Sequence, residues 1–230
     1  MAIKKHTECR ACKAKLTHRF LELGPTPLAN SFVRSEQLDK PEDFYPLDVY
    51  FCDSCGLVQL GQVVPPEIMF KNYVYVSGTS ATIPAHFANL AKEAVERFGL
   101  NKDSLVVDIG GNDGTLLRGF KNLNVRALNV EPATNIARIA EASGIETVNE
   151  FWNKQTAHEI AKEKGKAMLI LGTNVFAHVD DWNGFIEGVT TLLDDGGVFI
   201  IEAPYIVDLL EKTEFDTIYH EHLSYLAILP

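Results

Sequence analysis

The stretch Leu105-Val-Val-Asp-Ile-Gly-Gly-Asn-Asp-Gly-Thr-Leu-Leu117 decides the fold of this chain. It begins as a short apolar run, turns through Gly110, Gly111 and Gly114, and continues with apolar residues at helical spacing. In an open parallel sheet, a glycine turn after the first strand lets the backbone approach a ligand at the carboxyl end of that strand. The stretch therefore predicts the start of a doubly wound α/β domain with a ligand site at its glycine loop.

The chain after this loop alternates between strand-like and helix-like segments. The expected strands are 105–109, 125–130, 167–172 and 197–202, with Ile145-Glu-Thr-Val148 as a weaker candidate for the third strand. The expected helices lie near 115–121, 133–143, 154–164 and 182–193. Strands that alternate with helices imply right-handed crossovers and a parallel sheet. The predicted fold class is a doubly wound, Rossmann-like α/β sheet.

Acidic residues distinguish between the ligands that such a loop can bind. Asp108 ends the first expected strand, and a carboxylate there is poorly placed beside a dinucleotide pyrophosphate. S-adenosylmethionine carries an ammonium and a sulfonium, so nearby acids attract it. Glu131 ends the second expected strand, where a carboxylate can accept ribose hydroxyls, although NAD would need the same acid. Asp108 therefore favours S-adenosylmethionine.

Two aromatic residues, Phe151 and Trp152, follow the third expected strand. They can flank an adenine ring, and simple core packing is an equally good interpretation. The residues predicted on this reasoning to contact the cofactor are Asp108, Gly110, Gly111, Asn112, Gly114, Glu131, Phe151 and Trp152. A doubly wound domain without this cofactor is the alternative.

Composition and charge narrow the class of partner. The chain has 230 residues and a formal charge of −10, with 21 basic and 31 acidic residues. Binding to a phosphate backbone rests on Lys and Arg, so we expect no nucleic-acid partner. No apolar run approaches the roughly 20 residues that span a bilayer, and the first residues lack a hydrophobic signal core. We expect a cytoplasmic protein without a membrane partner.

The four cysteines form two Cys-x-x-Cys pairs, Cys9 with Cys12 and Cys52 with Cys55. Two such knuckles offer four thiolates to one tetrahedral metal. A site filled by four thiolates has no open position for substrate, so the metal would be structural. Zinc is the expected metal and four-thiolate iron the alternative, since softness and geometry do not separate them. Reduced unpaired cysteines or a disulfide fit less well in a cytosolic protein.

Near its end the chain carries four consecutive titratable residues, Tyr219, His220, Glu221 and His222. If this segment is extended, His220 and His222 point to one side and the other two residues to the opposite side. Histidine is the usual general base near neutral pH, and a neighbouring carboxylate can orient it. A solvated polar loop and a second metal site through His-x-His are the alternatives.

The order of motifs along the whole chain resembles the nucleotide-sugar C-methyltransferase family. The motifs are the two cysteine knuckles, Tyr73-Val-Tyr-Val-Ser-Gly-Thr-Ser80, the glycine loop, Asn174-Val-Phe-Ala-His178 and Phe215-Asp-Thr-Ile-Tyr-His-Glu-His-Leu-Ser-Tyr225. The last motif is the most specific. The resemblance implies methyl transfer from S-adenosylmethionine to C-3 of a TDP-linked 4-keto-deoxysugar, in deoxysugar biosynthesis, through a base-generated enolate.

The same resemblance assigns roles to individual residues. It places the base at His222, with Glu221 and Tyr219 beside it, and completes the sugar pocket with Tyr73 and His178. It also adds Asn174 to the residues expected on the cofactor side. Without the resemblance, His178 would be interpreted as a buried structural histidine and Tyr73 as a surface aromatic.

We expect a zinc-binding domain at 1–66, a substrate loop and linking helix at 67–100, and the cofactor-binding domain at 101–230. Members of the family usually continue into a second Rossmann-like domain, and we expect no such domain within this sequence. We therefore expect cofactor binding to survive and sugar binding to be weaker, with a C-terminal domain or a partner chain missing. The alternative functions are methylation of a different acceptor, and a cofactor-binding module that is inactive alone.

Overall fold

The computed structural model describes residues 3–228, which form two compact units. The first, here called the knuckle unit, contains residues 3–69, 177–182 and 203–228. The second, the parallel-sheet unit, contains residues 70–176 and 183–202. Each unit is described separately below.

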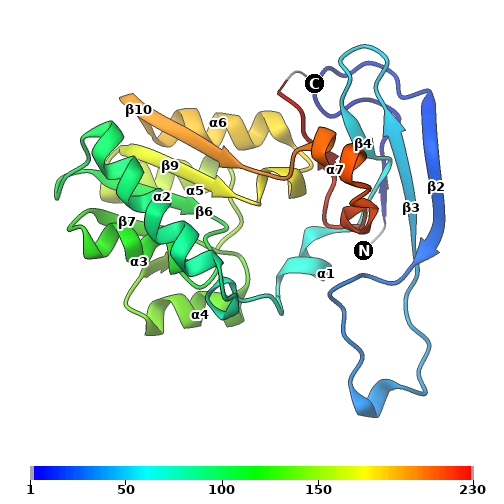
Figure 1. Ribbon diagram of the computed structural model, residues 1–230, viewed down its shortest axis with the longest axis horizontal. Helices are drawn as coiled ribbons and strands as arrows, with labels where there is room; N and C mark the ends of the chain where they lie inside the picture. The colour runs from blue at the N-terminus through cyan, green and yellow to red at the C-terminus, as the bar shows by residue number, and fades with distance from the viewer. Residues whose placement is uncertain (1–2, 229–230) are drawn as a thin grey trace. The chain divides into compact units, whose positions relative to one another are not determined.

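The parallel-sheet unit is built on five strands in the order β10-β9-β6-β7-β8, and every neighbouring pair is parallel (Figure 1). The strands are β6 (Leu105–Ile109), β7 (Arg126–Val130), β8 (Glu146–Val148), β9 (Ala167–Thr173) and β10 (Leu193–Glu202). All five strands predicted from the sequence are present, although β10 begins earlier than expected. The predicted fold class is confirmed.

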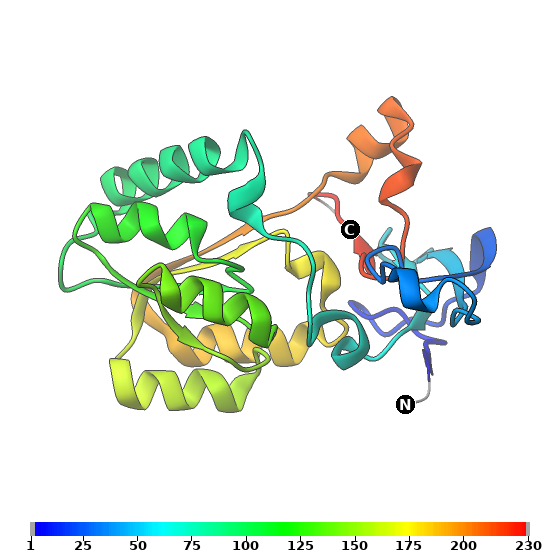
Figure 2. The ribbon, with the colours of Figure 1, turned by 90° about the horizontal axis from the view of Figure 1, so that it is seen from below.

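Helices cover both faces of this sheet. They are α2 (Ile83–Phe98), α3 (Thr115–Asn122), α4 (Thr134–Ala142), α5 (Lys154–Lys164) and α6 (Trp182–Leu192). Right-handed crossovers place α3 and α4 on one face and α5 and α6 on the other. Figure 2 shows α2 beside α3, across the sheet from α5 and α6. This arrangement leaves the carboxyl ends of the strands for the loops that carry the candidate site.

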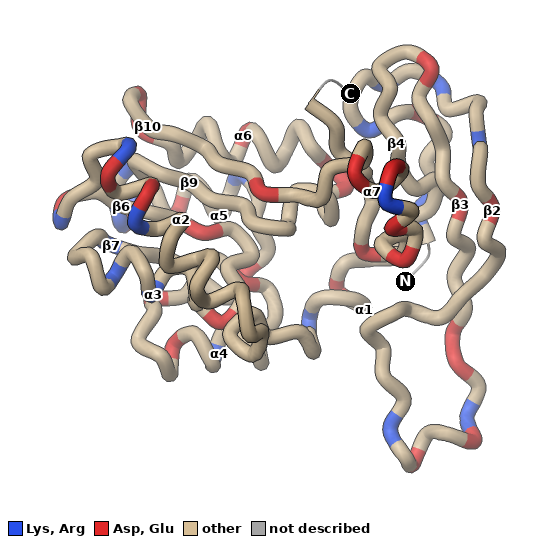
Figure 3. Tube along the Cα trace, viewed as in Figure 1, with Lys and Arg blue, Asp and Glu red and all other residues tan. Residues whose placement is uncertain are grey.

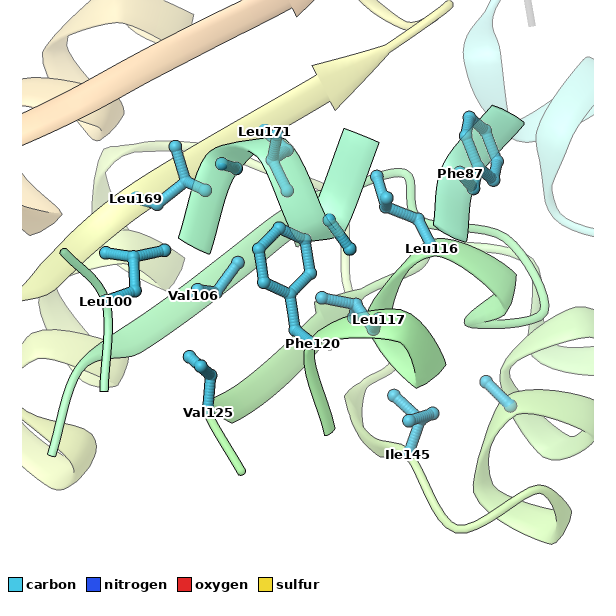
Figure 4. Packing of buried hydrophobic residues seen from close by; sticks show 13 residues of the cluster. Phe87, Leu100, Val106, Leu116, Leu117, Phe120, Val125, Ile145, Leu169 and Leu171 are labelled. Atoms are coloured by element: carbon cyan, nitrogen blue, oxygen red, sulfur yellow. The ribbon is translucent and has the colours of Figure 1, made fainter. Parts of the chain in front are cut away.

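The core of the parallel-sheet unit lies between the sheet and helices α2 and α3. Phe120 of α3 is fully buried there, and Leu117, Val106 and Leu171 belong to the same cluster (Figure 4). The apolar residues of α3 face this cluster, which explains why the sequence after the glycine loop forms a helix.

We expect Phe120→Ala to lower the free energy of unfolding by about 3–5 kcal/mol, because it leaves a cavity in a close-packed core. Leu123, which follows the same helix and is partly exposed, provides the control. Leu123→Ala should cost about 0.5 kcal/mol or less. Urea unfolding followed by circular dichroism measures both values, and equal losses would contradict this account of the core.

The knuckle unit contains two small antiparallel sheets. One sheet has the order β11-β4-β3-β2, and the other pairs β1 with β5. The strands are β1 (Lys4–Lys5), β2 (His18–Thr26), β3 (Tyr45–Phe51), β4 (Val58–Leu60), β5 (Gln62–Val63) and β11 (Ser224–Tyr225). Two short helices, α1 (Pro66–Phe70) and α7 (Ile206–Lys212), complete the elements longer than one helical turn.

The contacts divide the chain differently from the boundaries expected from the sequence. The expected division placed all of residues 101–230 in the cofactor-binding domain, whereas residues 203–228 pack in the knuckle unit. The physical reason is strand β11, in which Ser224 pairs with Gln59 of β4. Leu223 and Tyr225 also join the apolar cluster of the knuckle unit. The segment from Tyr219 to His222 therefore belongs to this unit.

Charged residues of both signs are distributed along both units, with acids in excess (Figure 3). Among residues 3–228, no helix combines the length and apolar character needed to cross a bilayer.

Candidate active site and metal centre

The glycine loop brings its backbone close to two buried side chains at the carboxyl end of β6. Gly110 has a φ angle of +65°, and Gly114, with φ of +74°, immediately precedes α3. A Cβ atom at Gly111 would lie 2.6 Å from Asn129 Oδ1 and 2.7 Å from Asp108 Oδ2. Only glycine fits there, so the loop is shaped by its sequence to lie against these polar atoms.

Asp108 is 1% exposed, and neither of its carboxylate oxygens has a hydrogen-bond partner among the described residues. Burial, followed by the charges of Glu131 and Glu202, raises its pKa well above the usual value. A buried carboxyl group without a donor is costly, and a bound cation or hydrogen-bond donor would relieve that cost. The residues present therefore fit the positively charged amino acid part of S-adenosylmethionine.

A raised pKa has a consequence for stability. Because Asp108 binds its proton more tightly in the folded chain, stability falls as pH rises above the unfolded-state pKa of about 3.9 towards the folded value. In Asp108→Asn this loss should be absent, so its free energy of unfolding should vary less with pH. Urea unfolding between about pH 4 and about pH 8 tests this. Asp194→Asn, at an exposed position of the same unit, should match the parent; an unchanged slope in Asp108→Asn would contradict the assignment.

Glu131 is held at the carboxyl end of the neighbouring strand β7. Its Oε1 accepts a hydrogen bond from Ala133 N at 2.8 Å, and its Oε2 accepts one from Asn112 N at 3.1 Å. Burial raises its pKa, and these two backbone bonds oppose that shift. The carboxylate is fixed beside the glycine loop and retains lone pairs for further donors.

The segment that contains Tyr73 is attached to the same loop. Asn112 Oδ1 accepts a hydrogen bond from Ser77 N at 2.9 Å, and Asn112 Nδ2 donates to Tyr75 O at 3.0 Å. Asn135 of α4 bonds both the N–H and the carbonyl of Tyr73, at 3.0 and 2.6 Å. Sequence reasoning missed Asn135, because nothing in the local pattern links it to a residue so distant along the chain.

Asn174 follows β9 with a φ angle of +57°, and its Nδ2 donates to Glu202 Oε1 at 3.4 Å. The other oxygen of Glu202 lies 2.6 Å from His86 Nε2. Asn174 is therefore positioned by the end of β10, at the same edge of the sheet as Asp108 and Glu131. Its role towards the cofactor stays a prediction.

Trp152 packs against helix α6. Its Nε1 donates to Phe185 O at 3.1 Å, and its ring lies close to Gly188, where a Cβ would come within 2.9 Å of Nε1. Phe151 is half-buried beside it. These contacts explain Trp152 as packing, and the adenine role of both aromatics stays a prediction.

The four cysteines converge as predicted. All four sulfurs lie within 4.8 Å of one another, with 3.7 Å between those of Cys9 and Cys55 and 3.6 Å between those of Cys12 and Cys52. A tetrahedral metal with metal–sulfur bonds of about 2.3 Å separates its ligands by about 3.8 Å. The residues present therefore fit a structural four-thiolate metal.

His222 is held in one tautomer. Its Nδ1 lies 2.8 Å from Thr217 O, and because a carbonyl can only accept, Nδ1 carries the proton. Its Nε2 therefore has a free lone pair, which accepts a hydrogen bond from the Tyr219 hydroxyl at 3.0 Å. Burial lowers the pKa of His222, while the bond to Thr217 opposes that shift. His222 is thus a neutral imidazole with its basic nitrogen defined.

His178 stacks on His222, with ring centroids 5.2 Å apart and planes at 28°. Burial, and then the charge of His222, lowers the pKa of His178 to about 3. Burial raises the pKa of Tyr219 to about 12, and Glu221 adds to the shift. At neutral pH these three side chains form an uncharged cluster that can give, accept or share protons.

Glu221 and His220 point elsewhere. Asn30 Nδ2 donates to Glu221 Oε1 at 2.8 Å, and His220 Nε2 donates to Tyr45 O at 3.0 Å. The segment is not extended, so the alternation of an extended chain does not apply: it makes a turn, with His222 N bonded to Tyr219 O, and Tyr219 and His222 meet. The two histidines bond separate backbone carbonyls and do not converge on a metal.

A small pocket of the knuckle unit exposes His222. Its lining is Ala177, Pro204, Tyr205, Ile206, Leu209, Thr217, His222, Ser224 and Tyr225. The structure therefore brings together His178, Tyr219 and His222 in this unit, and Asp108, the glycine loop and Glu131 in the parallel-sheet unit. Tyr73 belongs to the second group and Glu221 lies beside the first.

Two family models match this chain. Residues 85–228 match a family model described as "Methyltransferase domain", and residues 9–70 match one described as "Putative zinc binding domain". C-methyltransferase NovU from Streptomyces niveus is 38% identical over 221 residues, covering 96% of this chain and 53% of NovU. The chain thus spans about half the length of this curated relative.

Solved structures show weaker likeness. The PH0226 protein from Pyrococcus horikoshii is 14% identical with a TM-score of 0.49, covering 67% of this chain and 66% of its own. A SAM-dependent methyltransferase from Anabaena variabilis is 17% identical with a TM-score of 0.48, covering 64% and 67%. The fold assignment rests on the strand order described above.

The predictions of S-adenosylmethionine as cofactor and of a structural metal are confirmed at the level of family by the two models and the cysteine cluster. The roles of individual residues stay predictions. The chain belongs to the methyltransferase family whose domain model spans residues 85–228, and its zinc-binding domain precedes that region.

Proposed function

We propose that this protein transfers a methyl group from S-adenosylmethionine to a carbon atom beside a ketone. The observation that carries the proposal is the neutral imidazole of His222, whose basic Nε2 accepts a hydrogen bond from the Tyr219 hydroxyl. His222 also lines a small pocket. A carbon acid needs such a base, because the carbon must lose a proton to become a nucleophile. The name of the relative NovU, a C-methyltransferase, supports the same reaction type.

The proposed acceptor is a TDP-linked 4-keto-deoxysugar, methylated at C-3. The 4-keto group acidifies the C-3 hydrogen. Tyr219 takes that proton as its own hydroxyl proton passes to His222 Nε2, to which it is hydrogen-bonded, and the electron pair of the C–H bond forms an enolate. S-adenosylmethionine supplies, when bound, a methyl carbon activated by the adjacent sulfonium. The enolate carbon forms the new C–C bond as the S–CH₃ bond breaks, and the proton leaves His222 for solvent.

His178 and Tyr219, which form the uncharged cluster with His222, lower the barrier of this reaction. His178 stays neutral, because its pKa is about 3, and can therefore donate a hydrogen bond to a developing enolate oxygen. Tyr219 can relay the proton to His222, to which it is already bonded. Tyr73 and Glu221 are proposed to orient sugar hydroxyls.

The parallel-sheet unit is proposed to bind the methyl donor. Asp108 faces the ammonium group, Glu131 accepts the ribose hydroxyls, and the backbone of Gly110 to Gly114 borders the amino acid part. Asn112, Asn174, Phe151 and Trp152 complete the proposed contacts. The orphaned carboxyl group of Asp108 supports this assignment, because it lacks any protein donor among residues 3–228.

The base function can be tested without methyl transfer. In deuterated water with S-adenosylhomocysteine, the chain should speed incorporation of deuterium at C-3 of a TDP-4-keto-deoxysugar above the uncatalysed rate. Nuclear magnetic resonance of the sugar measures the rate of deuterium incorporation. The control is His158→Ala, at an exposed position of α5, which should exchange at the parent rate. Exchange no faster than without protein would contradict the proposal.

A second candidate is cofactor binding by this chain without turnover of its own, favoured by the location of Asp108, the glycine loop and Glu131 in a unit to which His222 does not belong. It predicts S-adenosylmethionine binding by calorimetry and no product unless a partner polypeptide is added. Turnover by this chain alone would exclude it.

A further inference from the structure

Arg10 is a buried charge in an unusual place. It lies between Cys9 and Cys12 in the first knuckle and is 1% exposed, the largest of the fully buried side chains. A buried guanidinium is tolerated only where its N–H donors find acceptors, because an unpaired buried charge is strongly unfavourable. The acceptors of Arg10 therefore show which chain segments its side chain holds in place.

Two of these acceptors belong to the segments that carry the two histidines. Arg10 Nη1 donates to the carbonyl of Leu223 at 2.6 Å, and Leu223 directly follows His222. Arg10 Nε donates to Asp180 Oδ1 at 3.4 Å, and Asp180 lies two residues after His178. One side chain thus bonds both chain segments whose imidazoles stack on each other.

The remaining acceptors fix the guanidinium itself. Arg10 Nη1 also donates to Gln59 Oε1 at 3.2 Å, and Nη2 donates to Leu60 O at 3.2 Å. Both acceptors belong to β4, the strand that pairs with β11. These bonds use three different nitrogens of a planar fork, which a lysine ammonium cannot reproduce.

Asp180 is itself held from the other side. Lys4 Nζ lies 2.6 Å from its Oδ2, and His6 Nε2 lies 2.7 Å from its Oδ1. Burial raises the pKa of Asp180, but the bonds from His6 and Lys4 and the charge of Arg10 outweigh it, so its pKa lies well below the usual range. The carboxylate is ionised and anchors the segment after His178.

We propose that Arg10 is a positioning residue, which links the four-cysteine centre to the histidine pair by holding the Leu223 carbonyl and Asp180 together. The inference rests on the proposed function, in which His178 and His222 act on the sugar. On this proposal the metal centre also supports the histidine pair. A metal bound by the four thiolates would fix the backbone of Arg10, and Arg10 fixes the spacing of the two imidazoles. A shift of about 1 Å in such a pair can cost about 100-fold in rate.

The test uses two variants. Arg10→Lys keeps the positive charge but loses the planar guanidinium. Asp180→Asn removes the anchoring carboxylate without changing a residue of the cysteine knuckle. The readout is the imidazole Nδ1–H of His222, recorded by nitrogen-15 nuclear magnetic resonance in the protein without substrate. In both variants we expect its exchange with solvent to accelerate by about tenfold or more. Metal content and S-adenosylmethionine affinity should stay at the parent values.

Turnover gives the second readout. We expect kcat to fall by about 10- to 100-fold in Arg10→Lys, with the KM for the methyl donor unchanged. Arg19→Lys is the matched control, because Arg19 pairs with Glu22 and Asp48, which lie outside both histidine segments. It should leave both readouts unchanged.

The resonance separates this inference from the proposed function, because it reports on His222 even in a chain that transfers no methyl group. Parent-like exchange in both variants would overturn the positioning role. Loss of metal from both variants would overturn it as well, since Arg10 would then serve the fold of the knuckle alone.

Discussion

His222→Asn is expected to lower kcat by about 10²–10⁴-fold, because asparagine cannot take up a proton at the position of Nε2. An asparagine amide can still donate to Thr217 O, so the local fold should persist. Calorimetry should give the parent affinity for S-adenosylmethionine, since the predicted cofactor residues belong to the parallel-sheet unit. Unaltered kcat would remove His222 as the base.

The pH profile offers a second check on the same residue. A general base works in its neutral form, and burial lowers the pKa of His222 below the usual value of about 6.5. Activity should therefore persist on the acid side to a lower pH than an exposed histidine would allow.

In Tyr219→Phe the hydrogen bond to Nε2 is lost, and kcat should fall without loss of the metal.

Removal of the metal is expected to have an effect of similar size. A four-thiolate site forms only in the folded chain, so metal binding contributes on the order of 10 kcal/mol to folding of the knuckle. In Cys12→Ser, elemental analysis should show loss of the single metal ion per chain, and kcat should become undetectable. S-adenosylmethionine affinity should survive in the parallel-sheet unit.

Ser54→Ala is the matched control for this experiment, since Ser54 is exposed between the cysteines of the second knuckle. It should keep the metal and the activity. A Cys12→Ser chain that loses its metal but retains full kcat would show that the knuckle is not needed for the histidine cluster, and would also weaken the role given to Arg10.

Local patterns were sufficient to predict the parallel-sheet unit. The apolar run ending at Asp108, the glycine turn and the following helix are properties of adjacent residues, and the structure has the strand Leu105–Ile109 where the sequence predicts it. The cysteine centre was equally accessible, because two Cys-x-x-Cys pairs require only that two loops meet.

Long-range pairings could not be predicted in the same way. Strand β11 pairs with β4 through residues more than a hundred positions apart, so the local pattern gave no sign that residues 203–228 pack in the knuckle unit. The burial of Arg10 is a second example. A charged residue between two cysteines is expected to be exposed from sequence alone, and only its contacts with Asp180 and Leu223 explain why it is buried.

The turn at Tyr219 illustrates how local geometry decides chemistry. Alternation along an extended chain would separate Tyr219 from His222, whereas the turn brings the phenol to within 3.0 Å of the imidazole. The composition of the segment offers candidate bases, but the hydrogen bond between the two side chains depends on backbone angles that composition does not specify.

The most direct measurement of the central claim is the position of a carbon-13 methyl group after incubation of the protein with labelled S-adenosylmethionine and a TDP-4-keto-deoxysugar. The account predicts a labelled methyl bonded to the sugar carbon next to the ketone, seen as carbon–carbon coupling in nuclear magnetic resonance, and absent with His222→Asn. A labelled methyl on oxygen or nitrogen, or product formation that does not depend on His222, would contradict it.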